Sequence, residues 1–305
     1  MMTREELGKA LRLSQAVVER DLSGFDFRGE SLQGAVFIKT PLRGASLVTC
    51  DLSSASFIGC DLTDFDIRGA VIHASTFADC TLAGVNFSAR TLDHTGFARC
   101  DLRGSNWSNQ QIVACTWASC DFSNANFEGA RLYRTAAHGS RFERSRWVRA
   151  TLERVALADM DWRTVDMTGI AADTAVLINA NLSGQKLSGI RLRRCTLQGA
   201  NLSDADLSGA DLTQANCLGA TFQRTVLRGA RVASAMLMEA RIQESDWSAV
   251  QMEGAVLQKA QVCDSTFAGA DAARSVWTSS VTRNVVFTGA DLSFADFSHS
   301  QLSRV

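Results

Sequence analysis

The sequence predicts an all-β solenoid, and three regularities along the chain support this prediction. Large apolar residues recur at every fifth position from Leu22 to Leu302, and 52 of these 57 positions hold Leu, Ile, Val, Met, Phe or Trp. All six tryptophans fall at these central positions, and 20 of the 22 glycines stand two residues after them. A helix of 3.6 residues per turn or a strand of period two would lose phase over this distance. The chain must therefore turn a corner every five residues.

The remaining positions of each five-residue unit are also patterned. A small residue stands two positions before the centre, and Asp or Asn often stands one position before it, as in residues 200–212, ANLSDADLSGADL. Glycine two positions after the centre is typical of a turn that needs a positive φ. Each unit therefore carries its own turn signal.

Over residues 20–305 these units resemble those of the pentapeptide-repeat proteins. The resemblance implies a right-handed, square, parallel β-helix with four units per coil. The central and small residues would point inward and the other three outward. The 57 units would form about 14 coils, a rod of ~65–70 Å at the usual strand spacing of ~4.8 Å. Residues 20 positions apart would then stack.

Residues 1–19 are predicted to form a helical cap on the repeat domain, residues 20–305. Thr3 and Glu6 have the spacing of a capping box, and apolar residues at near-helical spacing predict an amphipathic helix over residues 4–19. This helix either covers the first coil or binds a partner. The C-terminus shows no such helix, so its last coil either frays or pairs with another chain, which would give a homodimer.

Irregular residues predict small loops. Arg90, Gln110, Met160 and Gln185 occupy the small inward site, and a buried unpaired arginine would be costly. Together with the weak centres Ala137 and Ala172, they predict loops near residues 88–92, 108–112, 135–140 and 170–175.

Seven of the nine cysteines occupy the small inward site, which indicates small buried hydrophobic residues, not a disulfide framework or metal ligands. Only Cys263 is expected to be exposed. We therefore expect a reducing compartment, the bacterial cytoplasm. The N-terminus does not look like a signal peptide, and no apolar run of 18 residues predicts a membrane span.

One outward column is unusually apolar under the 20-residue coil. It holds Ile38, Ile58, Ile178, Leu218 and Met238, and the column two positions earlier adds further apolar residues (Val36, Val176, Met236, Val256 and Val276). Such a surface either contacts a protein partner or is a regular β-face that prefers branched residues.

Charge is uneven along the chain, although the net charge is −1. Residues 129–163 hold eight arginines against four acids. Arg134, Arg154 and Arg194 would share one edge, which either binds an acidic partner or is a solvated face.

No motif predicts catalysis. The four histidines are scattered without ligand spacing, and the sequence lacks GxSxG, P-loop and CxxC motifs. We therefore expect no enzyme, cofactor, metal or small-molecule substrate.

The resemblance implies binding by surface display, and the main hypothesis is a protein–protein interaction scaffold or adaptor. The order of the chain is similar to that of pentapeptide-repeat proteins associated with bacterial type VI secretion: the stretch TREEL, then a short helix, then the repeats. Those proteins are thought to help load effectors. Alternatives are a secreted effector, a passive structural spacer, and a DNA mimic that binds topoisomerase (gyrase). The DNA mimic needs an acidic face, and the near-neutral charge argues against it and against nucleic-acid binding.

Overall fold

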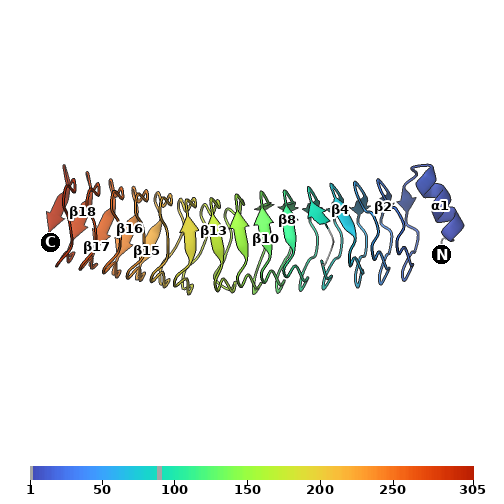
Figure 1. The fold of residues 1–305 in the computed structure, drawn as a ribbon, viewed down its shortest axis with the longest axis horizontal. Helices are drawn as coiled ribbons and strands as arrows, with labels where there is room; N and C mark the ends of the chain where they lie inside the picture. Colours follow the sequence, from blue (N-terminus) through green and yellow to red (C-terminus); the bar gives the residue numbers. More distant parts are fainter. Residues whose placement is uncertain (1–2, 88–90) are drawn as a thin grey trace. The chain divides into compact units, whose positions relative to one another are not determined.

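The computed structural model describes residues 3–87 and 91–305. It is a parallel β-solenoid of about 14 turns with one short N-terminal helix, α1. Paired strand residues are 20 positions apart, as in the series Phe37, Phe57, Phe77 and Phe97, so four five-residue units form each coil. By internal contacts the chain divides into Met1–Thr151 with Thr164–Asp166, and Leu152–Arg163 with Met167–Val305. Within each unit, successive coils stack in sequence order (Figure 1).

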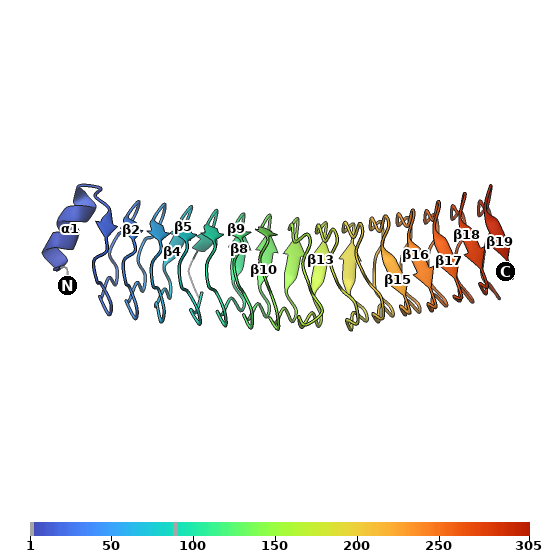
Figure 2. The same cartoon turned by 180° about the vertical axis from the view of Figure 1, so that it is seen from behind.

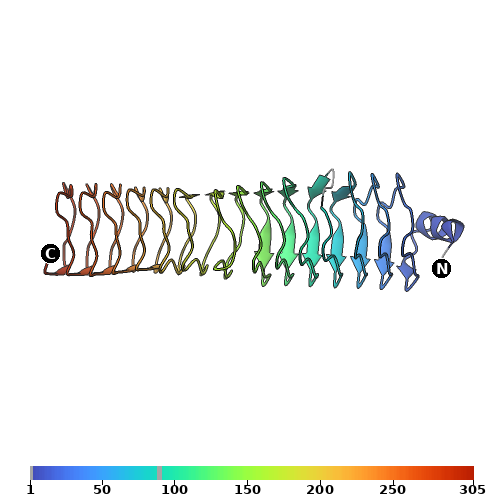
Figure 3. The ribbon, with the colours of Figure 1, turned by 90° about the horizontal axis from the view of Figure 1, so that it is seen from below.

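Helix α1 (Arg4–Arg12) starts with the predicted capping box. The Glu6 amide donates to Thr3 Oγ1 at 3.2 Å, and the Thr3 amide donates to Glu6 Oε2 at 2.8 Å. The helix lies beside the first coil (Figure 3). The prediction of a helix to residue 19 was wrong, because β1 (Val17–Val18) already pairs with the next coil. Branched valines favour an extended backbone, and Val17 is only 2% exposed there.

In the first unit the strands lie on two faces. One face is a parallel sheet in the order β1, β2 (Val36–Ile38), β3 (Ser56–Ile58), β5 (Thr76–Ala78), β7 (Gly96–Ala98), β9 (Thr116–Ala118) and β11 (Ala136–His138). The other holds β4 (Val71–His73), β6 (Thr91–Asp93), β8 (Gln111–Val113) and β10 (Arg131–Tyr133) in that order. Strand β12 (Thr151–Glu153) lies where the two units meet in sequence.

In the second unit, β13 (Ala171–Asp173) pairs in parallel with β14 (Arg191–Arg193). This unit also contains a five-stranded parallel sheet. The sheet follows chain order (Figure 2): β15 (Thr221–Gln223), β16 (Arg241–Gln243), β17 (Gln261–Cys263), β18 (Val281–Arg283) and β19 (Gln301–Ser303).

The interior is filled by the central residues, which stack between coils. The rings of Phe37, Phe57, Phe77 and Phe97 lie nearly parallel, with centroids 4.9–5.1 Å apart. All six tryptophans are buried. Burial of this aromatic surface is a main source of stability.

The residue type at the small inward site depends on whether a turn or a strand precedes it. Where it is alanine, its amide usually closes a turn on the carbonyl three residues earlier, as Ala35 does on Leu32 at 3.0 Å. After most strands it is Thr, Ser or Cys, whose side chain donates to carbonyls instead. Thr95 Oγ1, for example, donates to the Ile72 carbonyl at 3.2 Å and the Asp93 carbonyl at 3.0 Å. The Asp93 carbonyl also accepts the Ala74 amide at 3.0 Å, so the hydroxyl gives this oxygen a second donor, for which a carbonyl has a second lone pair.

Aspartate and asparagine before the centre stabilise the turns. The Asp51 carboxylate accepts the Ser53 amide at 2.9 Å, and Asp61 accepts the Thr63 amide at 3.0 Å. Such side chains mimic a backbone turn, which explains their recurrence in the sequence.

The predicted loops near 108–112, 135–140 and 170–175 were wrong, because each stretch keeps the 20-residue register with a neighbouring coil. Gln110 and Met160 are buried at the small site, and Gln185 Nε2 reaches the Trp162 carbonyl at 2.6 Å. The long side chains therefore fit without an insertion. Within the stretch near 88–92, Arg90 lies outside the described residues.

The predicted burial of the seven small-site cysteines is confirmed. All nine cysteines are free, and all except Cys263 are buried. Cys263, expected to be exposed, is half-buried in β17. Burial raises the pKa of Cys115 to about 11 and that of Cys195 and Cys217 to about 12. Several thiols also donate to carbonyls, as Cys80 Sγ does to Phe57 at 3.3 Å. They are thus more than hydrophobic fillers.

Candidate protein-binding patches and a histidine–aspartate cluster

In the first unit, four outward residues form what we call the first apolar patch (Val18, Val36, Ile38 and Ile58). Register pairs Val18 with Ile38 and Ile38 with Ile58. Val18 is 46% and Ile58 39% exposed, and the other two are half-buried. Beyond Ile58 the column continues with alanines, from Ala78. Within the first unit, the large apolar residues of this column are therefore confined to the first coils.

The second unit contains what we call the second apolar patch (Leu218, Met236, Met238, Val256 and Val276). Bridges join Met236 to Val256 and Val256 to Val276, and the Gly219 amide donates to the Met238 carbonyl at 2.8 Å. Met236 is 39% exposed and the others are half-buried.

Ile178, also predicted as a contact residue, is half-buried two coils before the second patch. Its neighbouring column changes from Val176 to the polar residues Thr196 and Asn216 before Met236. Ile178 is therefore separated from the second patch by a polar surface.

The three predicted arginines are exposed, but they do not form one free basic edge. The Arg134 guanidinium lies over the Tyr133 ring, 5.0 Å from its centroid. In the second unit, Arg194 forms an ion pair with Asp173, with Nη2 to Oδ2 at 2.5 Å and Nε to Oδ1 at 3.1 Å. Thr174 occupies the corner between Arg154 and Arg194.

Other arginines of the basic segment are neutralised by acids from elsewhere in the chain. Arg141 pairs with Asp121 at 2.7 Å, and both Arg146 and Arg149 pair with Glu128. These contacts favour the solvated face over an anion-binding site.

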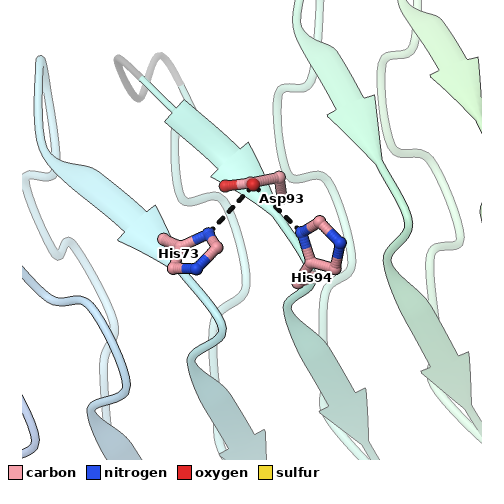
Figure 4. Close-up of side chains that lie close together, drawn as sticks. All are labelled: His73, Asp93 and His94. Atoms are coloured by element: carbon pink, nitrogen blue, oxygen red, sulfur yellow. Dashed lines mark hydrogen bonds and ion pairs between the residues drawn. The ribbon is translucent and has the colours of Figure 1, made fainter.

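His73 and His94, which show no metal-ligand spacing in the sequence, lie together in the structure. His73 ends β4 and Asp93 ends β6, and the register pairs these two residues directly. His94 follows at the corner with φ +52°. Figure 4 shows both imidazoles turned toward the same carboxylate, with each Nδ1 close to Asp93 Oδ2, at 2.9 Å for His73 and 3.0 Å for His94. His73 and His94 are 21 positions apart in the sequence, and this separation predicts that they lie close together only when the 20-residue length of a coil is known.

The cluster is open to solvent on one side. The side chains of His73 and His94 are 49% and 59% exposed, and that of Asp93 is 23% exposed. Burial alone would raise the pKa of Asp93, but hydrogen bonds from His94 and His73 hold it below its ordinary value.

The central residues of the last coil are less buried than those elsewhere. Phe287, Leu292 and Phe297 are half-buried, Leu302 in β19 is 48% exposed, and the neighbouring Phe294 is 86% exposed.

Among the described residues, no helix is long and apolar enough to cross a membrane.

The repeat, the parallel register and the filled interior define the protein class as a β-solenoid that displays side chains outward from a square coil. The family model for pentapeptide repeats matches residues 115–146, 175–214, 205–243 and 278–305, and the model for a pentapeptide repeat region matches residues 50–116. Together they cover more than half of the chain. The protein belongs to the pentapeptide repeat family.

Solved structures of pentapeptide repeat proteins are similar to this chain at low sequence identity. QnrB1, a plasmid-mediated fluoroquinolone resistance protein, is 18% identical over 66% of this chain and 88% of its own, with a TM-score of 0.38. HetL from the cyanobacterium Nostoc sp. strain PCC 7120, involved in heterocyst differentiation regulation, is 20% identical over 97% and 95%, with a TM-score of 0.19. The comparison with curated proteins gave no match.

Proposed function

We propose that this protein is a non-enzymatic protein–protein interaction scaffold that binds its partner through the two apolar patches. The observation that carries the proposal is the stacking of exposed Met236 on Val256 and Val276, beside half-buried Leu218 and Met238. Contiguous exposed apolar surface is a feature of contact sites, and methionine side chains adapt to a partner's shape.

In its more specific form, the proposal is a bacterial cytoplasmic adaptor that helps load a type VI secretion effector. Its support is a resemblance in sequence order: TREEL, then a short helix, then the repeats, as in pentapeptide-repeat proteins associated with bacterial type VI secretion. Helix α1 buries Leu7 and Ala10, which favours its role as a cover for the first coil.

A pull-down from the native cytoplasm tests the proposal. One bait carries Ile38→Glu with Ile58→Glu, and a second carries Met236→Glu with Met238→Glu. The matched control carries Leu13→Glu with Val286→Glu, which changes two exposed apolar residues outside both patches (56% and 48% exposed). Circular dichroism verifies that each bait is folded.

We expect a partner that binds the wild type and the control but is lost from at least one patch variant. Equal capture by all four baits would contradict the patch proposal. Capture of a DNA topoisomerase by all of them would favour the DNA-mimic hypothesis.

The proposal also includes a homodimer through the C-terminal coil, supported by the half-buried Phe287 and Phe297 and the exposed Leu302. Light scattering should then give twice the chain mass for the wild type and the chain mass for Leu302→Glu. A wild type of single-chain mass at high concentration would contradict the dimer.

A further inference from the structure

We propose that His73, Asp93 and His94 form a surface binding site for a divalent transition-metal ion such as Zn²⁺. The three residues offer two imidazole nitrogens and a carboxylate oxygen that all lie within 4.8 Å of one another. This proposal does not depend on the protein-binding function.

The fold preorganises the three side chains. Parallel pairing of β4 and β6 places Asp93 directly beside His73. The Ala74 amide donates to the Asp93 carbonyl at 3.0 Å, and the His94 amide donates to the Val113 carbonyl at 2.9 Å. Backbone bonds to coils on both sides therefore hold the segment that carries the ligands, so little ordering is needed when an ion binds.

The spacing of the donor atoms suits a transition metal. Zinc binds histidine nitrogen and carboxylate oxygen at about 2.0–2.2 Å, so two ligands at right angles lie about 3 Å apart and two at the tetrahedral angle about 3.4 Å apart. The distances from Asp93 Oδ2 to the two Nδ1 atoms, 2.9 and 3.0 Å, match the right-angle separation and are slightly shorter than the tetrahedral one. An ion can therefore replace the two hydrogen bonds with small shifts of the side chains.

The donor types favour one class of ion. Imidazole suits Zn²⁺, Cu²⁺ and Ni²⁺, whereas Ca²⁺ and Mg²⁺ prefer oxygen ligands. Two histidines and one carboxylate leave coordination positions open, and the exposed imidazoles face solvent that can supply water ligands. The ring centroids are 5.5 Å apart and the planes are inclined by 65°, so the rings do not block one another.

A second observation at Asp93 is independent of the histidines. Its other oxygen, Oδ1, is buried and has no hydrogen-bond partner in the described part of the chain. Buried polar atoms without partners are rare. Coordination by both carboxylate oxygens would give Oδ1 a partner.

The test is titration of the untagged full chain with zinc chloride by calorimetry, in a Cys263→Ser background because Cys263 is the one cysteine that is not buried. We expect one Zn²⁺ per chain. His73→Asn and His94→Asn should each weaken binding at least about tenfold. His138→Asn, which removes another exposed histidine, should leave binding unchanged.

Histidine ring signals in NMR give a second readout, because the chain has only four histidines. Zinc should shift the signals of His73 and His94 and leave those of His138 and His299 in place. Absence of binding at millimolar zinc, or binding that His73→Asn and His94→Asn do not weaken, would overturn the proposal.

Discussion

The Thr40 hydroxyl donates a hydrogen bond to the Val17 carbonyl one coil away, with Oγ1 and O 2.9 Å apart. It also lies 3.2 Å from the Ile38 carbonyl. Thr40 is fully buried, so no water can replace it. This contact joins β1, beside the helical cap, to the regular repeat.

Thr40→Val should destabilise the protein, because it keeps the shape of the side chain but removes its hydrogen bond to the buried Val17 carbonyl, whereas the Ile38 carbonyl still accepts the Glu19 amide at 2.9 Å. We expect a loss of about 0.5–1.5 kcal/mol in the free energy of unfolding, measured by urea denaturation. Thr76→Val is the control, since Thr76 is exposed in β5 and the change there should be close to zero. Equal effects of the two substitutions would contradict the role given to the hydroxyl.

Ser105 and Trp107 should be energetically coupled. The indole Nε1 of Trp107 donates to Ser105 Oγ at 2.7 Å, and both residues are fully buried. A double-mutant cycle with Ser105→Ala and Trp107→Phe should give a coupling energy of about 0.5–1.5 kcal/mol. Trp117, whose Nε1 has no partner within the described residues, is the comparison, and a cycle of Cys115→Ala with Trp117→Phe should show weaker coupling.

Thiol reactivity should distinguish Cys263 from the other cysteines. Eight cysteines are buried, and burial raises the pKa of thiols such as Cys115 and Cys195, so the reactive thiolate is scarce. An aromatic disulfide reagent at pH 8 should modify one thiol in the native protein and nine in denaturant. In the Cys263→Ser variant the native count should fall to zero. Rapid reaction of several native thiols would contradict this burial.

Thermal stability should fall in acid. Hydrogen bonds from Thr63 lower the pKa of Asp61, those from Ser53 lower that of Asp51, and Arg28 lowers that of Asp26 to about 2. A carboxylate with a lowered folded-state pKa adds stability above its unfolded pKa, and that stability is lost as pH falls through the folded pKa. The Tm should therefore stay nearly constant from pH 7 to 5 and decrease from about pH 4 to 2.

Asp61→Asn provides the matched test, because the amide oxygen can still accept the Thr63 N–H but does not titrate. Its Tm should decrease less between pH 4 and 2 than that of the wild type. A Tm of the wild type that is unchanged down to pH 2 would show that these carboxylates do not contribute.

The five-residue period predicted the coil geometry because it is a strong local signal repeated along most of the chain. The buried centres and the burial of Cys50 or Cys195 followed from it directly. The loop predictions were wrong because a long side chain at the small site does not require an insertion. The Gln110 side chain is accommodated there, and its amide Nε2 donates to the Gln111 carbonyl at 3.2 Å.

The candidate sites depended on contacts that the linear sequence does not show. Ile38 and Ile58 were predicted as neighbours once a 20-residue coil was assumed, and their register is confirmed. The ion pair of Arg194 with Asp173 and the cluster around Asp93 were missed. Arg194 and Asp173 are 21 positions apart, and His73 and Asp93 are 20 positions apart. Whether such side chains meet depends on how they are oriented near a corner of the coil.

The sequence by itself determined the repeat, the inward and outward positions and the helical start at Thr3, because these depend on residue size, turn propensity and local capping. Only the tertiary structure decided which faces carry extended strands, which arginines are neutralised, and that His73 and His94 share Asp93. Those outcomes depend on side chains from successive coils that meet a few ångströms apart, and the pairing of such groups is set by the packed coil and not by the neighbours along the chain.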